Sequence, residues 1–144
     1  MGTLNSLSAR SLQYLVIAKK WNADIEFYKF EMKFLRLLLE NNYSILQNNG
    51  DRDTVKRINN DLMRLDSEKN QLERSLGDQI QQLELMSEDI IPEDVTLVAG
   101  KQIRLEYMVT GLFSEYKDLK REIFYLVQQA SAQNNLLGQF TFPN

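Results

Sequence analysis

The fold is decided by residues 53–90, which read DTVKRINNDLMRLDSEKNQLERSLGDQIQQLELMSEDI. Steps of alternately three and four residues through this stretch select mostly apolar side chains. The selected positions are Val55, Ile58, Leu62, Leu65, Lys69, Leu72, Leu76, Gln79, Leu83, Met86 and Ile90. This spacing places its members on one side of an α-helix, and its repetition is typical of helices that pack along their length. We therefore predict one long helix near 53–90 with an apolar seam.

Two further stretches have the same spacing. Between Val95 and Ala130 it selects an almost wholly apolar set, and upstream it selects a seam that includes Trp21, Ile25, Tyr28, Met32 and Leu35. Turn signals separate the three stretches, namely NNGDRD at 48–53 and SEDIIPED at 87–94, where Pro92 interrupts a helix. The sequence predicts helices near 4–47, 53–90 and 93–133 and no strands, because no segment alternates with a period of two.

Short connections make consecutive helices neighbours. We therefore expect an all-α fold, an elongated antiparallel three-helix bundle with up-down-up topology and coiled-coil-like packing. A chain of 144 residues has room for one such domain, which we assign to 1–134. Residues 135–144 contain Gly138 and Pro143 beside apolar side chains, so we predict a non-helical apolar tail that docks on a bundle.

Two polar positions interrupt the seam of 53–90. Lys69 is expected at the level of Glu31 and Glu115, in a structural polar layer that fixes the register of the helices. Gln79 is expected near Trp21, where its amide oxygen would accept a hydrogen bond from the indole nitrogen.

Residues 27–42, FYKFEMKFLRLLLENN, carry a second apolar side. At about 100° per residue, a second stripe lies about 150° from the seam of the same helix. We call this set the phenylalanine stripe, and its members are Val16, Ala23, Phe27, Phe30, Phe34 and Leu37. Three covers are open from the sequence, which are the helix near 93–133, the C-terminal tail, or another protein chain. The third follows from the tendency of large exposed apolar patches to mark interfaces, most often between two identical copies.

The composition argues against catalysis. Histidine and cysteine are absent, which removes imidazole and thiolate chemistry and the metal sites built from them. No phosphate loop or nucleophile elbow occurs. We therefore predict no enzyme activity, no catalytic residues, no cofactor, no metal site and no small-molecule substrate.

The charge balance of 17 basic and 20 acidic residues gives a net charge of −3, which disfavours a nucleic-acid partner. No apolar run has the length of a membrane span, and the lack of cysteine favours the cytoplasm. Binding to nucleic acid or to a membrane surface is kept as a weaker alternative, because basic residues and aromatic residues alternate near 19–36.

The main hypothesis is a non-enzymatic interaction or scaffold protein that self-associates through the phenylalanine stripe. The alternative is a small helical chaperone or adaptor that binds an amphipathic segment of a partner protein in an apolar groove.

Overall fold

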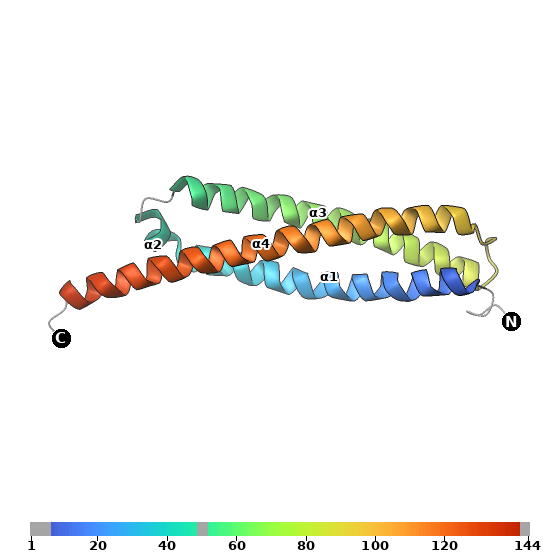
Figure 1. Ribbon diagram of the computed structural model, residues 1–144, viewed down its shortest axis with the longest axis horizontal. Coiled ribbons are helices and arrows are strands. Elements are labelled where there is room, and N and C mark those ends of the chain that lie inside the picture. Colours follow the sequence, from blue (N-terminus) through green and yellow to red (C-terminus); the bar gives the residue numbers. More distant parts are fainter. Residues whose placement is uncertain (1–6, 49–51, 142–144) are drawn as a thin grey trace. The chain divides into compact units, whose positions relative to one another are not determined.

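A computed structural model describes the backbone of residues 7–48 and 52–141 and the side chains of residues 7–48 and 52–132. Over these residues the protein is all-helical and contains no strand. The helices are α1 (Ala9–Asn41), α2 (Tyr43–Asn48), α3 (Arg52–Ser87) and α4 (Val95–Thr141), as labelled in Figure 1. The all-α prediction is confirmed.

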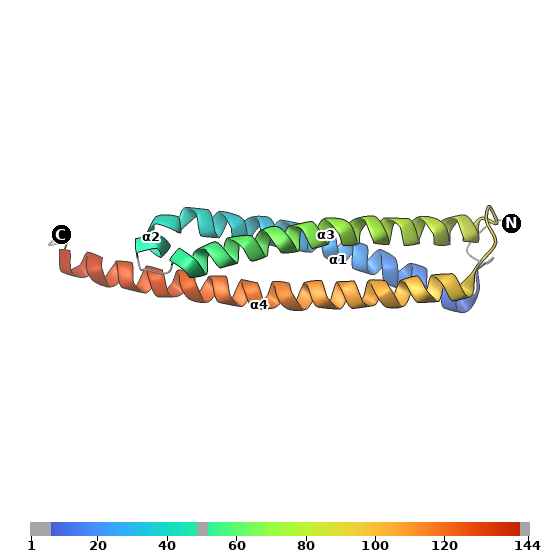
Figure 2. The same ribbon diagram turned by 90° about the horizontal axis from the view of Figure 1, so that it is seen from above.

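The chain divides into two compact units. Unit 1 consists of Met1–Lys29 and Ser67–Phe113, and unit 2 consists of Phe30–Asp66 and Ser114–Asn144. Each unit contains part of α1, part of α3 and part of α4, and unit 2 also contains α2. Figure 2 labels these four helices in a second view. The assignment of one domain to 1–134 stays a prediction.

The apolar seams form the core of both units. In unit 1 the buried set includes Ala18, Ile25, Leu72, Leu76, Leu83, Val98, Leu105 and Leu112. In unit 2 it includes Met32, Leu35, Leu39, Leu46, Ile58, Leu62, Leu65, Tyr116 and Ile123. The seam positions Ile90 and Val95 are exposed, because α3 ends at Ser87 and Val95 is only the first residue of α4.

The predicted helix 4–47 is interrupted at Asn42, between α1 and α2. The Asn42 backbone N–H donates to the Leu39 carbonyl at 3.3 Å, while the Asn42 side-chain amide donates to the Leu38 carbonyl at 2.8 Å. In an uninterrupted helix the Leu38 carbonyl would accept the Asn42 backbone N–H. The side chain therefore competes with the backbone, which is the behaviour that makes asparagine a poor interior residue.

A left-handed residue terminates α3. Asp89 has a φ of 59°. The Asp89 N–H donates to the Met86 carbonyl at 3.2 Å and the Ile90 N–H donates to the Leu85 carbonyl at 3.0 Å. These two bonds define a Schellman motif with Asp89 at the position that glycine usually occupies.

The start of α4 agrees with the prediction to within two residues. Asp94 is its N-cap, because its carboxylate accepts the Leu97 N–H at 3.0 Å and its carbonyl accepts the Val98 N–H at 3.0 Å. Pro92 and Glu93 precede this cap and lie outside the helix.

The C-terminal end of α4 differs from the prediction. The helix continues to Thr141, so the non-helical tail predicted at 135–144 is wrong for the backbone of residues 135–141. Proline appears only at position 143, and one glycine inside a helix costs only about 1 kcal/mol, so Gly138 does not stop the helix. The predicted docking of the tail rests on side chains that lie outside the described residues. Residues 142–144, and the first residues of the helix predicted near 4–47, also lie outside them.

The Schellman motif gives a stability prediction. Asp89→Gly should unfold with a free energy about 1 kcal/mol higher than Asp89→Ala, because only alanine carries the steric cost of a positive φ. Both variants lose the same carboxylate, so their difference isolates the backbone term. Urea denaturation of the two variants measures it, and equal midpoints would show that the α3 terminus does not hold this conformation in solution.

Candidate interaction surface and polar clusters

Five members of the phenylalanine stripe are large, exposed apolar side chains. Their exposed fractions are 62% for Val16, 61% for Phe27, 74% for Phe30, 54% for Phe34 and 49% for Leu37. Ala23 is exposed as well. All six lie on the single helix α1, the first three stripe residues in unit 1 and the last three in unit 2.

These exposed fractions test one of the three covers considered from the sequence, namely the helix near 93–133. Because about half or more of each large side chain is accessible, residues 95–132 of α4, whose side chains are described, do not bury the phenylalanine stripe. The tail remains an untested cover, since its side chains lie outside the described residues. In unit 1 the Phe27 and Tyr28 rings form a T-shaped pair with centroids 6.0 Å apart, and Tyr28 stacks on Phe113 with centroids 4.3 Å apart.

Glu31 is the centre of a polar cluster in unit 2. The Tyr116 hydroxyl donates to Glu31 Oε2 at 2.5 Å, and Lys120 Nζ donates to Glu31 Oε1 at 3.0 Å. Partial burial raises the pKa of Glu31, but the hydrogen bonds from Tyr116 and Lys120 outweigh it and hold the pKa below its usual value. Tyr116 is fully buried, so its hydroxyl needs this acceptor.

The two carboxylates of the predicted polar layer are engaged by residues that the sequence did not single out. Glu31 pairs with Lys120, and Glu115 accepts a hydrogen bond from Arg64 at 2.6 Å on the surface of unit 2. Lys69 is only 5% exposed and belongs to unit 1. The membership of Lys69 in the layer stays a prediction.

Two buried glutamines link the three helices of unit 1. Gln79 Nε2 on α3 donates to the Val98 carbonyl and to Gln102 Oε1 on α4, both at 3.1 Å. Gln102 Nε2 in turn donates to the Tyr14 carbonyl on α1 at 3.2 Å. The predicted bond from Trp21 to the Gln79 oxygen is wrong, because Gln79 Oε1 is buried without a hydrogen-bond partner and the Gln79 amide is turned toward α4.

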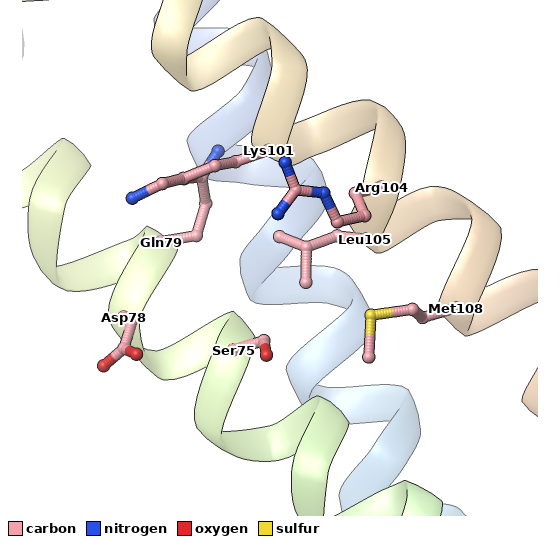
Figure 3. A pocket seen from close by; sticks show the side chains of 7 residues that line it. All are labelled: Ser75, Asp78, Gln79, Lys101, Arg104, Leu105 and Met108. Atoms are coloured by element: carbon pink, nitrogen blue, oxygen red, sulfur yellow. The ribbon is translucent and has the colours of Figure 1, made fainter.

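A small cavity lies beside this pair, between α3 and α4 of unit 1. Its volume is about 150 Å³, and its lining is Ser75, Asp78, Gln79, Lys101, Arg104, Leu105 and Met108. Figure 3 shows Lys101 and Arg104 extending from α4 across the groove toward α3. Pockets that bind small molecules typically hold about 300–1,000 Å³, so this groove is small for a ligand site.

The N-terminus of α1 is capped by a group from 85 residues away. Ser8 Oγ accepts the Ser11 N–H at 3.2 Å, which makes Ser8 the N-cap. Glu93 accepts the Ser8 N–H at 2.9 Å, the Ser8 hydroxyl at 2.6 Å and the Ser11 hydroxyl at 2.7 Å. This is the bonding of a capping box with its carboxylate supplied by the segment before α4.

The same hydrogen bonds set the charge state of Glu93. The Ser8 hydroxyl lowers the pKa of Glu93 most, partial burial opposes it, and Ser11 and the Ser8 backbone lower it further. Sequence reasoning missed this cluster. Ser8 is a typical N-cap residue, but a carboxylate so distant in the chain cannot be assigned to it without the fold.

Membrane-spanning and metal-binding features are both absent from the described part of the chain. Across residues 7–48 and 52–141, no helix has the length and apolar content needed to cross a bilayer. Among the residues that the structure describes, no three histidine, cysteine, aspartate or glutamate side chains gather in a group that could hold a metal ion.

Comparison with known proteins gives no assignment. No protein-family model matches the chain, and no match is found among curated proteins or among solved structures.

The capping cluster gives a pH prediction. Because the folded-state pKa of Glu93 lies below its unfolded value, its contribution to stability is fully present above about pH 4.5 and is lost as the pH falls through the folded pKa. Glu93→Gln should lower the free energy of unfolding by about 1–2 kcal/mol at pH 7, and this difference should shrink toward about pH 3. Urea titrations at both pH values measure it, with the exposed Glu88→Gln as control. A deficit of the same size at both pH values would contradict the assignment.

The glutamine pair gives a second prediction, in the form of a double-mutant cycle. Gln79→Leu and Gln102→Leu should each destabilise the protein by about 1–3 kcal/mol, because each leaves a buried polar group without its partner. The double variant should be less destabilised than the sum of the singles, because both glutamines are then replaced by apolar groups. Additive losses measured by thermal unfolding would show that the two side chains do not bond to each other.

Proposed function

We propose that this chain is a non-enzymatic interaction protein that self-associates as a homodimer through the phenylalanine stripe. The observation that carries the proposal is the exposure of Val16, Phe27, Phe30, Phe34 and Leu37 along one side of a single helix. Large exposed apolar patches on proteins mark interaction sites, and closed pairs of identical chains are the commonest assemblies.

The scaffold that presents the stripe is, in this proposal, an up-down-up three-helix bundle with coiled-coil-like packing. Contacts within unit 1 support opposite directions for α1 and α3, since Lys19 pairs with Glu84 and Lys29 pairs with Glu73. Residue numbers rise on α1 as they fall on α3.

Contacts of α4 support the same topology. Within unit 2, Arg57 pairs with Glu122 and Arg64 pairs with Glu115, so α3 and α4 run in opposite directions. Within unit 1, numbers rise together on α1 and α4, from the bond between Ser8 and Glu93 to the stacking of Tyr28 on Phe113.

The size of the stripe is sufficient for a specific contact. Aromatic side chains bury about 150–250 Å² each when covered completely. At the observed exposures, three phenylalanines with Val16 and Leu37 offer on the order of 500 Å² per copy, before the flanking side chains are added. Two copies then bury about 1,000 Å², the lower bound for a specific protein interface.

Composition along α1 supports a protein partner. The exposed charges beside the stripe alternate in sign, since Lys19 and Lys33 lie on the same side as Glu26 and Glu40. A nucleic-acid surface needs basic residues gathered on one face, whereas mixed signs beside an apolar strip are typical of helix-on-helix contacts.

Replacing one phenylalanine tests the proposal. Phe30→Asp should convert a dimer into a monomer, because a carboxylate in the centre of the contact costs about 2 kcal/mol or more of association free energy. The folded chain should keep its stability, since Phe30 is 74% exposed. Sedimentation velocity over a concentration series gives the mass.

The matched control is Met63→Asp on α3, which changes a side chain that is 69% exposed but lies off the stripe. It should leave the dimer intact. A wild-type chain that stays monomeric at every concentration would contradict the proposal. A monomer that binds an amphipathic helical peptide would support the adaptor function instead.

A further inference from the structure

We infer that the two copies pair α1 against α1 in antiparallel orientation, around a two-fold axis close to residues 28 and 29. This arrangement rests on the proposed self-association and adds the orientation and register of the partner helix. The positions of exposed side chains on the single helix α1 carry it.

The exposed stripe has its own repeat of alternating three and four residues. Its positions are Val16, Lys20, Ala23, Phe27, Phe30, Phe34, Leu37 and Asn41, all of them exposed. Two antiparallel helices with such a repeat form layers in which the two kinds of position face each other. The proposed register places Phe27 opposite Phe30 and places the small Ala23 opposite the large Phe34. The outer layers join Lys20 to Leu37 and Val16 to Asn41.

The register is selected by the charges on one flank of the stripe. Lys19, Glu26, Lys33 and Glu40 are exposed and recur every seven residues, with alternating sign. In antiparallel pairing this flank faces the same flank of the second copy. The proposed register places Glu26 opposite Lys33 and Lys19 opposite Glu40, and symmetry repeats each pair. All four contacts are attractive.

The neighbouring registers are opposed by the same charges. A shift by one repeat in one direction places Lys33 opposite Lys33 and Glu26 opposite Glu40. A shift in the other direction places Glu26 opposite Glu26 and Lys19 opposite Lys33. Like charges across a helix interface are destabilising, and such contacts determine partner choice in helix pairs.

Parallel pairing is also disfavoured. It stacks Lys20 on Lys20 in the apolar layer, while its flank contacts are mixed, with Lys19 beside Asp24 and Glu26 beside Glu31 of the second copy. It also places each phenylalanine, and Ala23, against the same residue of the second copy. The fit of the small Ala23 against the large Phe34 in the antiparallel register is then lost.

The existing partners of these residues do not block the pairing. Lys19 lies 3.5 Å from Glu84 and Glu26 lies 3.4 Å from Lys29, but the side chains of Lys19 and Glu26 remain 56% and 53% exposed. On the opposite flank the register joins Ile17 to Leu38, both apolar. It also brings Asp24 near Glu31, whose charge is offset by Lys120.

Cysteine cross-linking tests the orientation, because the chain contains no cysteine of its own. At a rise of about 1.5 Å per residue, the proposed register separates the two copies of residue 23 by about 16 Å and the two copies of residue 16 by about 37 Å along the axis. A disulfide requires Cα atoms within about 7 Å. Val16→Cys mixed with Asn41→Cys should therefore give a cross-linked pair containing one of each variant.

The same experiment separates the two orientations. Ala23→Cys alone should give no cross-linked dimer, whereas parallel pairing would join residue 23 to itself. Non-reducing electrophoresis with copies of two different masses identifies the products. A strong Ala23→Cys homodimer, with the mixture of Val16→Cys and Asn41→Cys unlinked, would overturn the inference.

A charge exchange tests the register. Lys33→Glu and Glu26→Lys should each raise the Kd of the dimer about tenfold, because each turns two attractive contacts into repulsive ones. The double variant should return to within about threefold of the wild type. Lys56→Glu, which changes an exposed lysine on α3, is the control and should have no effect. Unchanged single variants, or a double variant weaker than either, would overturn the register.

The outcomes distinguish this arrangement from the function on which it rests. If the wild type is a dimer that Phe30→Asp dissociates, but Ala23→Cys cross-links to itself, only the antiparallel orientation fails. If the wild type is monomeric, both proposals fail together.

Discussion

The structure depends on the burial of apolar side chains that recur every three and four residues along three long helices. An isolated helix is marginal in water, so α1, α3 and α4 are stable only because each buries its seam against the others within each unit. Each buried leucine or isoleucine contributes about 1.5–3 kcal/mol when it leaves water. Residues such as Ile25, Leu72 and Leu76 in unit 1, and Leu35, Leu62 and Ile123 in unit 2, supply this term.

Such a seam alone does not specify how the helices align, because sliding by one repeat leaves similar apolar contacts. Polar residues inside the seam remove this freedom, since their hydrogen bonds form at one level only. Gln79 and Gln102 form such a level in unit 1, where they join α3 and α4 to the Tyr14 carbonyl on α1. In unit 2, Tyr116 and Lys120 converge on Glu31. Ser11, buried at the start of α1, bonds to Glu93 and aligns the end of the helix in the same way.

The seams were predictable because they result from residue spacing, and most of the side chains they select are buried, although Trp21 and Tyr28 are only half-buried. The exposed stripe was also visible from spacing on α1, although the sequence did not decide whether α4 covered it. The features that the sequence did not predict correctly involve groups whose state depends on local competition or on distant partners. Asn42 divides the first predicted helix through its own side chain, and the amide of Gln79 turns to Val98 and not to Trp21. The carboxylate that caps α1 comes from Glu93, which no local pattern assigns.

The two apolar sides of α1 have different consequences for the molecule. Ile25, Met32 and Leu35 are almost completely buried, so changes there act on the free energy of folding. Phe30 and Phe34 remain mostly accessible in the single chain, and replacing them removes little buried area. In the proposed dimer, stability and association are therefore carried by separate residues of one helix, which allows either property to be altered with little effect on the other. Seam contacts hold α1 in the folded chain, so the exposed side of this helix is already ordered before a second copy arrives. Pairing through a preformed helix avoids most of the ordering entropy that a flexible segment would lose, which favours the proposed dimer despite its modest contact area.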